Sequence, residues 1–146
     1  MPPSPETLLV EDNPYDAELV IHSLKLANLA NHLVHVSDGQ SALDFLFGIG
    51  TYEGRDIHVQ PKVVFLDLKL PKLDGLEVLK RIRANQHTQL VPVVILTSSR
   101  EDCDITCGYQ LGANSYIVKP VEFDAFTDTV TKTVFYWLKT NVAHHQ

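Results

Sequence analysis

Residues 63–71 read VVFLDLKLP, and this stretch decides which fold the chain can adopt. Four apolar residues run without alternation into an acid, Asp67, and the stretch ends at Pro71. An unbroken apolar run of this length predicts a strand buried on both faces, as in parallel sheets covered by helices. Functional side chains in such open sheets gather at the carboxyl ends of the strands. Asp67 is therefore a candidate functional residue, although a solvated acid at a strand end would give the same pattern.

Four other short apolar runs are typical of strands, and the segments between them have helical periodicity. The predicted strands are Thr7–Val10, Leu33–Val36, Val93–Leu96 and Ser115–Val118. Three predicted helices begin after Asn13, Asp38 and Gly75. The fourth and fifth predicted helices span about Arg100–Leu111 and Glu122–Lys139.

Five strands that alternate with five helices predict right-handed crossovers and an α/β fold, a doubly wound three-layer sandwich. We expect a flexible leader at residues 1–6, one domain over residues 7–140 and a tail at residues 141–146. Residues 48–60 carry three glycines and no apolar period, which predicts a loop. Loops this long in compact domains are usually functional or disordered.

The composition excludes several classes of protein. The chain has 146 residues, of which 45% are hydrophobic and 21% charged, as in ordinary globular domains. A net charge of −6 without a basic block argues against a nucleic-acid surface. No apolar run approaches the roughly 18 residues that span a membrane, and the N-terminus lacks a signal pattern. We expect a cytoplasmic protein that binds neither nucleic acid nor membrane.

Polar side chains follow four of the predicted strands. Glu11 and Asp12 follow the first strand, Asp67 the third, Thr97 the fourth and Lys119 the fifth. If the strand order is 2-1-3-4-5, the first and third strands are neighbours and their carboxylates converge. Carboxylates held this close raise one another's pKa unless a cation neutralises them. Mg²⁺ suits such a site because it binds a few carboxylates and keeps waters and a phosphoryl oxygen.

The hydroxyl of Thr97 and the ammonium of Lys119 are both suited to phosphoryl oxygens. Together with a carboxylate nucleophile and a metal ion, they would form an aspartyl-phosphate site. Each residue alone also has a structural explanation, as a helix cap, a strand end or a turn. Their joint occurrence at four strand ends favours the site.

The sequence resembles the response-regulator receiver family. The resemblance lies in four ordered motifs, LLVEDN at residues 8–13, VFLDLKLPKLDGLEVL at 64–79, VPVVILTSS at 91–99 and GANSYIVKPV at 112–121. It covers roughly residues 7–138. It implies a flavodoxin/CheY-like fold with a five-stranded parallel sheet in the order 2-1-3-4-5.

The resemblance implies that Asp67 accepts a phosphoryl group from a phosphohistidine on a sensor histidine kinase. It also implies that Asp12, Asp67 and the backbone carbonyl of Lys69 bind Mg²⁺ (or Mn²⁺), with Glu11 assisting. Lys69 lies two residues after the nucleophile, a position that varies among receivers and tunes dephosphorylation, so it leaves the phosphoryl lifetime open.

The same resemblance assigns the switch. Thr97 and Lys119 would contact the phosphoryl group, and Tyr116 would change rotamer as Thr97 moves. The resemblance further implies a cis peptide bond between Lys119 and Pro120, which would direct the lysine into the site.

A closer resemblance is to the stand-alone response regulators paired with cyanobacterial phytochromes. It lies in the loop at 48–60, in KPVEFDAF at 119–126 and in FYWL at 135–138. It implies a phytochrome as the sensor histidine kinase.

The leading interpretation is a single-domain receiver, a phosphorylation-dependent protein-binding switch for an unidentified downstream protein and not an enzyme. One alternative is a Mg-dependent aspartyl-nucleophile phosphatase resembling the haloacid dehalogenase family. Those enzymes place the nucleophile after the first strand with a second Asp two residues later, where this chain has Lys69. Another alternative is a receiver-fold adaptor that binds partners without phosphorylation.

The last predicted helix has more apolar surface than one sheet face requires. At 100° per residue, one stripe of apolar side chains along this helix is enough to cover the sheet. Phe135, Leu138 and Val142 form an adjoining stripe. Exposed apolar patches usually mark an interface. We therefore expect a homodimer through the fourth helix, the fifth strand and the fifth helix, which the family resemblance also favours. The alternative is that the loop at 48–60 or the tail covers these residues.

Overall fold

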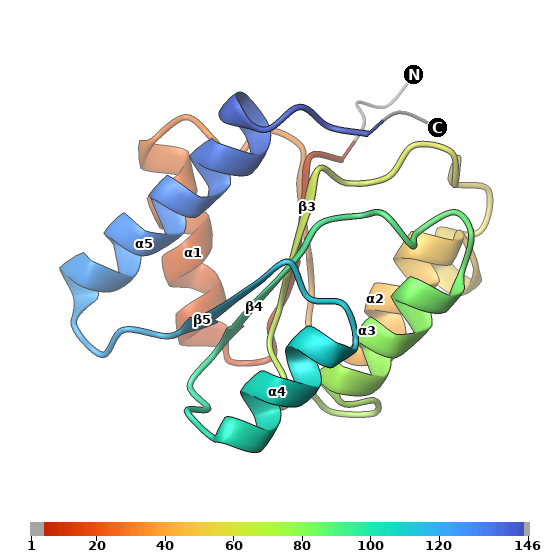
Figure 1. Cartoon of the computed structure of the whole chain (residues 1–146). Coiled ribbons are helices and arrows are strands. Elements are labelled where there is room, and N and C mark those ends of the chain that lie inside the picture. The colour runs from red at the N-terminus through yellow and green to blue at the C-terminus, as the bar shows by residue number, and fades with distance from the viewer. Residues whose placement is uncertain (1–4, 145–146) are drawn as a thin grey trace.

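The computed structural model describes residues 5–144, which form a five-stranded parallel sheet between two helical layers (Figure 1). The strands are β1 (Thr7–Val10), β2 (Leu33–Val36), β3 (Val63–Leu66), β4 (Val93–Thr97) and β5 (Ser115–Val118). The α-helices are α1 (Pro14–Leu26), α2 (Gly39–Phe47), α3 (Gly75–Ala84), α4 (Asp102–Gln110) and α5 (Phe123–Phe135). A 3₁₀ turn, η1 (Gly50–Tyr52), and a π turn, η2 (Tyr136–Thr140), complete the fold.

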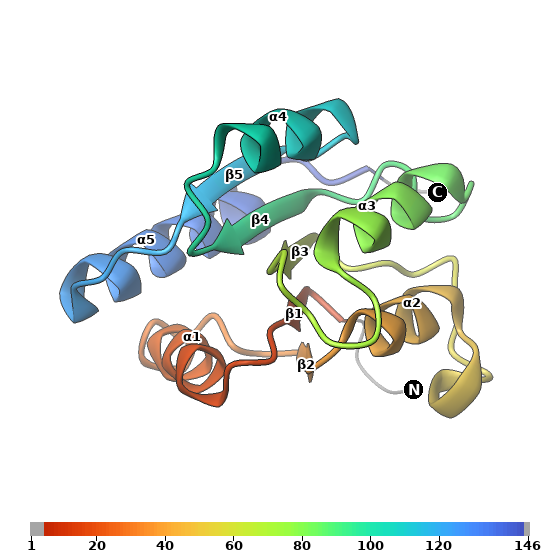
Figure 2. The same ribbon diagram turned by 90° about the horizontal axis from the view of Figure 1, so that it is seen from below.

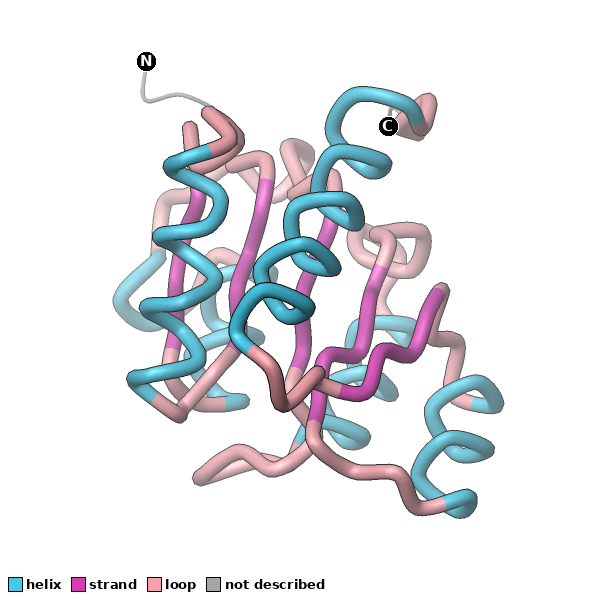
Figure 3. The backbone as a smooth tube through the Cα atoms, turned by 90° about the vertical axis from the view of Figure 1, so that its left-hand side faces the viewer, coloured by secondary structure: helices cyan, strands magenta, loops and turns pink. Residues whose placement is uncertain are grey.

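The sheet order is β2-β1-β3-β4-β5, and every neighbouring pair is parallel. Helices α1 and α5 cover one face, and α2, α3 and α4 cover the other (Figures 1 and 2). Figure 3 shows α1 and α5 side by side in front of the strands. The predicted fold class, strand order and helix number are confirmed. The expected leader and tail extend to residues 1–4 and 145–146, which lie outside the described residues.

The core has one apolar cluster on each face of the sheet. The central strand β3 contributes to both clusters, because all four of its residues are buried. Val64 and Leu66 pack with α2 and α3, whereas Val63 and Phe65 pack with α1 and α5. This burial on both faces is the reason that the VVFL run does not alternate. No helix in the described part of the chain is long and apolar enough to cross a membrane.

Helix α3 begins directly against the backbone that follows β3. Asp74 caps the helix by accepting a hydrogen bond from the Glu77 backbone N–H at 3.1 Å. The Gly75 backbone N–H donates to the Leu68 carbonyl at 2.8 Å. A Cβ atom at Gly75 would collide with the backbone oxygen of Asp67, so only glycine permits this approach. The loop that carries Asp67 is therefore held close to the start of α3.

The loop at 48–60 is ordered by Arg55. Its guanidinium donates to the carbonyls of Phe45 at 2.6 Å and Val59 at 2.7 Å, and to the Gln60 side chain at 3.0 Å. It also lies 4.2 Å from the centroid of the Phe45 ring, a cation–π contact. These contacts fold the loop back onto the end of α2.

A second arginine, Arg83, joins the end of α3 to the amino ends of β4 and β5. It donates to the carbonyls of Val91 at 2.7 Å and Gly112 at 2.9 Å, and to the Asn114 side chain at 2.8 Å. Asn114 in turn accepts from the Val93 backbone N–H at 2.8 Å. Helix α4, which ends just before Gly112, is otherwise loosely packed, since Gly108 is its one buried residue.

The predicted cis bond between Lys119 and Pro120 is wrong, because none of the peptide bonds in the described part of the chain is cis. The lysine is aimed by other means. Its backbone N–H donates to the Thr97 carbonyl at 2.7 Å. This hydrogen bond holds the residue that follows β5 beside the end of β4.

The predicted exposure of Leu138 is also wrong. The α-helix gives way to the π turn at Tyr136–Thr140, which has more residues per turn and breaks the 100° periodicity assumed for the whole helix. Leu138 is consequently 8% exposed and packs with the cluster under α1 and α5. Phe135 and Val142 are 53% and 90% exposed, as the pattern predicted.

Leu138→Ala should therefore lower the free energy of unfolding by about 2–4 kcal/mol, because it leaves a cavity in the core. Phe135→Ala, the matched control, should change it by less than about 1 kcal/mol, because that side chain is half exposed. Urea unfolding followed by circular dichroism measures both values. Equal effects of the two substitutions would contradict the burial assigned to Leu138.

Candidate functional site

The predicted acids lie together at the carboxyl ends of β1 and β3, the edge of the sheet that faces the viewer in Figure 2. Val10 and Leu66 are register partners, so the residues that follow them leave the sheet side by side. Carboxylate oxygens of Glu11, Asp12 and Asp67 all lie within 4.8 Å of one another. We call these three residues the acid cluster. Glu11 and Asp67 are buried, and Asp12 is exposed to solvent.

The ammonium of Lys119 neutralises part of this charge. Its Nζ lies 2.7 Å from Glu11 Oε1, 2.9 Å from Asp67 Oδ2 and 2.8 Å from Asp16 Oδ2. Sequence reasoning did not identify Asp16, which lies in the first turn of α1. No local pattern marks it, because its partner Lys119 lies 103 residues further along the chain.

The pKa values of the site follow from burial and from these contacts. Burial raises the pKa of Glu11 to about 7, although the hydrogen bond from Lys119 acts in the opposite direction. Burial also tends to raise the pKa of Asp67, but Lys119 and hydrogen bonds with Glu11 and Thr97 outweigh it and lower the pKa. Burial tends to lower the pKa of Lys119, but hydrogen bonds to Asp16, Glu11 and Asp67 outweigh it and raise the pKa. Glu11 is thus the acid that exchanges its proton near neutral pH, while Asp67 stays ionised there.

Thr97 and Tyr116 approach the site from β4 and β5. Thr97 is fully buried at the end of β4, and its side chain hydrogen-bonds with Asp67. The Ser99 backbone N–H donates to Thr97 Oγ1 at 3.5 Å, and the Tyr116 hydroxyl donates to the Ser99 carbonyl at 3.0 Å. Ser99 therefore connects the two predicted switch residues.

Lys69 lies at the rim of the site. Its backbone N–H donates to Asp67 Oδ1 at 3.4 Å, so the two oxygens of Asp67 face different partners. The side chain of Lys69 is exposed and enters no ion pair in the described part of the chain. The role of its backbone carbonyl as a metal ligand stays a prediction.

The donor set of the acid cluster fits a hard divalent cation. All of its side-chain ligands are carboxylate oxygens, and the exposure of Asp12 leaves room for waters and a phosphoryl oxygen. The buried Glu11 and Asp67 supply negative charge that one lysine does not fully neutralise. The geometry can therefore support metal-assisted chemistry at Asp67.

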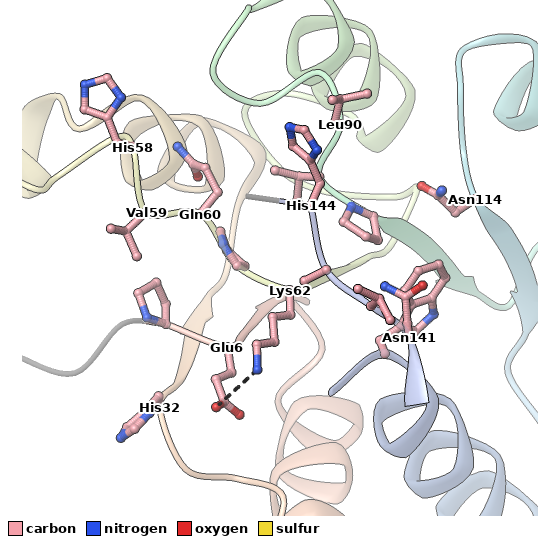
Figure 4. Close-up of a pocket in the computed structure, with 17 residues that line it drawn as sticks. Glu6, His32, His58, Val59, Gln60, Lys62, Leu90, Asn114, Asn141 and His144 are labelled. Carbon is pink, nitrogen blue, oxygen red and sulfur yellow. Dashed lines mark ion pairs between the residues drawn. The ribbon is translucent and has the colours of Figure 1, made fainter. Parts of the chain in front are cut away.

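A cavity of about 870 Å³ lies at the opposite edge of the sheet (Figure 4). Glu6, Lys62, Pro92 and Asn114, which directly precede β1, β3, β4 and β5, contribute to its wall. Its acid, Glu6, faces Lys62 at 3.9 Å in Figure 4. The cavity shares no residue with the acid cluster and lies at the wrong ends of the strands for the chemistry described above.

Comparison with known proteins assigns the family. The response regulator receiver domain matches residues 7–131. The chain is 38% identical over 134 residues to the probable methanogenesis regulatory protein FilR2 of Methanothrix harundinacea, covering 92% of this chain and 84% of that protein. It is 37% identical over 133 residues to the response regulator Rcp1 of Synechocystis sp., covering 91% and 88% respectively.

Solved structures agree. The Mn²⁺-bound form of response regulator Rcp1 superposes with a TM-score of 0.88 at 35% identity, over 97% of this chain and 99% of that one. The phosphorylated cyanobacterial phytochrome response regulator RcpA gives a TM-score of 0.88 at 33% identity, also over 97% of this chain and 99% of that one. The bacteriophytochrome response regulator AtBRR gives 0.73 at 44% identity, over 98% of each chain. On its fold, its clustered acids and these relatives, the chain belongs to the response-regulator receiver family.

Proposed function

We propose that this chain accepts a phosphoryl group on Asp67 from a sensor histidine kinase and acts as a phosphorylation-dependent binding switch. The observation that carries the proposal is the placement of the Asp67 carboxylate. Its oxygens lie within the acid cluster, and one of them is 2.9 Å from the Lys119 ammonium. An ionised carboxylate beside a cation site is the arrangement that an aspartyl-phosphate nucleophile requires.

Glu11, Asp12 and Asp67 would hold Mg²⁺, with the backbone carbonyl of Lys69 as a further ligand. The bound cation would neutralise charge on the phosphoryl oxygens. An Asp67 oxygen attacks phosphorus, the N–P bond to the donor imidazole breaks, and the electron pair and a proton stay with the imidazole. Lys119 and the Thr97 hydroxyl stabilise the transferred oxygens by charge and hydrogen bonding.

Phosphorylation would act on the partner surface through β4 and β5. When Thr97 turns its hydroxyl toward the new oxygens, it changes the surroundings of Ser99, whose carbonyl accepts the Tyr116 hydroxyl at 3.0 Å. Tyr116 then changes rotamer, because phosphorylation favours the arrangement in which Thr97 contacts the phosphoryl group.

A phytochrome is the kinase that best suits this chain. Its similarity to Rcp1, RcpA and AtBRR extends over almost the whole described chain, and two of these relatives are phytochrome response regulators by description. A Mg-dependent phosphatase is less well supported, because Lys69 occupies the place where that chemistry needs a second acid. An adaptor independent of phosphorylation would not need buried acids around Asp67.

A homodimer is the assembly we propose. The surface around the end of α5 exposes Phe135 (53%), Tyr136 (48%) and Val142 (90%), and Tyr109 of α4 is 51% exposed. Large apolar side chains that are exposed on these elements favour association. The interface would combine α4, β5 and α5 and would adjoin Tyr116.

Asp67→Asn should abolish phosphorylation. With a small phosphodonor such as acetyl phosphate and Mg²⁺, the unchanged chain should carry a single hydroxylamine-labile phosphate, measured by mass spectrometry of the intact protein. Asp74→Asn, which alters an acid that only caps α3, should be labelled normally. Labelling that survives Asp67→Asn would refute the assignment of the nucleophile.

Mg²⁺ binding should strengthen as the pH rises toward 7. Glu11, whose pKa is raised to about 7, is protonated below that pH, and the cation must displace this proton. The apparent affinity should therefore rise up to about tenfold per pH unit below 7 and level off above it. Titration calorimetry at several pH values measures it, and Glu11→Gln should flatten the profile. A flat profile for the unchanged chain would contradict the assigned proton.

Phe135→Asp combined with Val142→Asp should convert the dimer into a monomer, because both exposed side chains would place charge in the interface. Analytical ultracentrifugation at micromolar concentration, with and without beryllium fluoride as a phosphoryl mimic, measures the mass. Ile49→Asp, at an exposed apolar site just after α2 and outside the proposed interface, is the matched control. If the unchanged chain is monomeric in both conditions, the dimer does not exist.

A further inference from the structure

Among residues 5–144, Asp16 is the one ion-pair partner of Lys119 that does not belong to the acid cluster. The lysine contacts three carboxylates at nearly equal distances, 2.7 Å to Glu11, 2.8 Å to Asp16 and 2.9 Å to Asp67. Glu11 and Asp67 also belong to the set that fits a divalent cation, whereas Asp16 does not. The lysine side chain is 9% exposed, and the Asp16 side chain is 28% exposed, so this third contact lies at the solvent side of the buried pair.

The local structure of α1 leaves the Asp16 carboxylate free for this contact. Asp16 is the third residue of the helix, where an acid commonly reaches back to the backbone N–H of the cap residue. Here the cap residue, Asn13, donates its backbone N–H to Glu11 Oε2 at 3.2 Å. The Asn13 side chain accepts from the backbone N–H groups of Tyr15 and Asp16. The carboxylate of Asp16 is not needed for capping, and it points to Lys119.

Lys119 and a divalent cation compete for the same oxygens. Both are attracted to Glu11 and Asp67, and each lowers the affinity of the other by thermodynamic reciprocity. A lysine with no other partner would stay on these two carboxylates and exclude the cation. A third carboxylate outside the acid cluster favours the cation in this competition, because it can keep its ion pair with the ammonium when the cation binds the other two carboxylates.

We propose that Asp16 is a positioning residue that holds Lys119 beside the site, so that Mg²⁺ can occupy Glu11 and Asp67 without displacing the lysine from reach of the phosphoryl group. The proposal rests on the metal site proposed above. Asp16 acts through Lys119 and not on the cation itself, and this distinction can be measured.

Asp16→Asn should weaken Mg²⁺ binding about fivefold, because Lys119 then competes with the cation for Glu11 and Asp67 without an alternative partner. Asp16→Glu, which keeps the charge, should retain most of the affinity. Glu18→Gln, which removes an exposed acid of the same helix with no ion pair to Lys119, should leave the affinity unchanged. Amide NMR shifts during a Mg²⁺ titration give the dissociation constants, and thermal unfolding shows whether each variant is folded.

The decisive measurement repeats Asp16→Asn in a Lys119→Gln background. With the competing ammonium removed, Mg²⁺ should bind more tightly than to the unchanged chain, and Asp16→Asn should then alter the affinity by less than about twofold. An undiminished fivefold loss in that background would mean that Asp16 attracts the cation directly, which overturns the proposal. So would an unaltered affinity in Asp16→Asn alone. If the unchanged chain binds no Mg²⁺, the proposed metal site itself fails.

Discussion

The contact of one ammonium with buried carboxylates is the constraint on which the site depends. Glu11 and Asp67 lie in an interior where an uncompensated charge costs several kcal/mol, and Lys119 is the cation that the described structure supplies. The three residues come from the loops after β1, β3 and β5, so the ion pairs join segments that are far apart in the sequence. The same shortage of positive charge that makes the lysine necessary gives the site its attraction for a divalent cation.

The order of the strands is what allows this arrangement. Because β1 lies between β2 and β3, the chain leaves β1 toward one face and β3 toward the other, and the two loops diverge around a shared edge. The acid cluster lies between these two loops. The approach of α3 to the Asp67 backbone, permitted by Gly75, then fixes one side of the site, and the capping of α1 by Asn13 fixes the other.

The sequence alone predicted most of the fold, because strand burial and helix periodicity are local properties of VVFL and its counterparts. It also identified the acid cluster, because parallel strands bring their carboxyl ends to one edge. It failed where tertiary contacts decide the outcome. The pairing of Asp16 with Lys119 depends on where α1 lies relative to the loop that follows β5, which no local pattern encodes. The burial of Leu138 depends on a π turn, and an extrapolated helical period places that residue on the wrong side.

Helix α4 is held by more contacts at its carboxyl end than at its amino end. Arg83 and Asn114 fasten the chain that follows it to β4, whereas the segment before it contacts the body of the protein through Ser99, which accepts from Tyr116 and donates to Asp104 at 2.6 Å. With a single glycine as its buried residue, the helix has little packing to resist movement. The amino end of the helix can consequently move more than its carboxyl end. Amide hydrogen exchange along the helix would then be graded, fastest near Asp102 and slowest near Gln110.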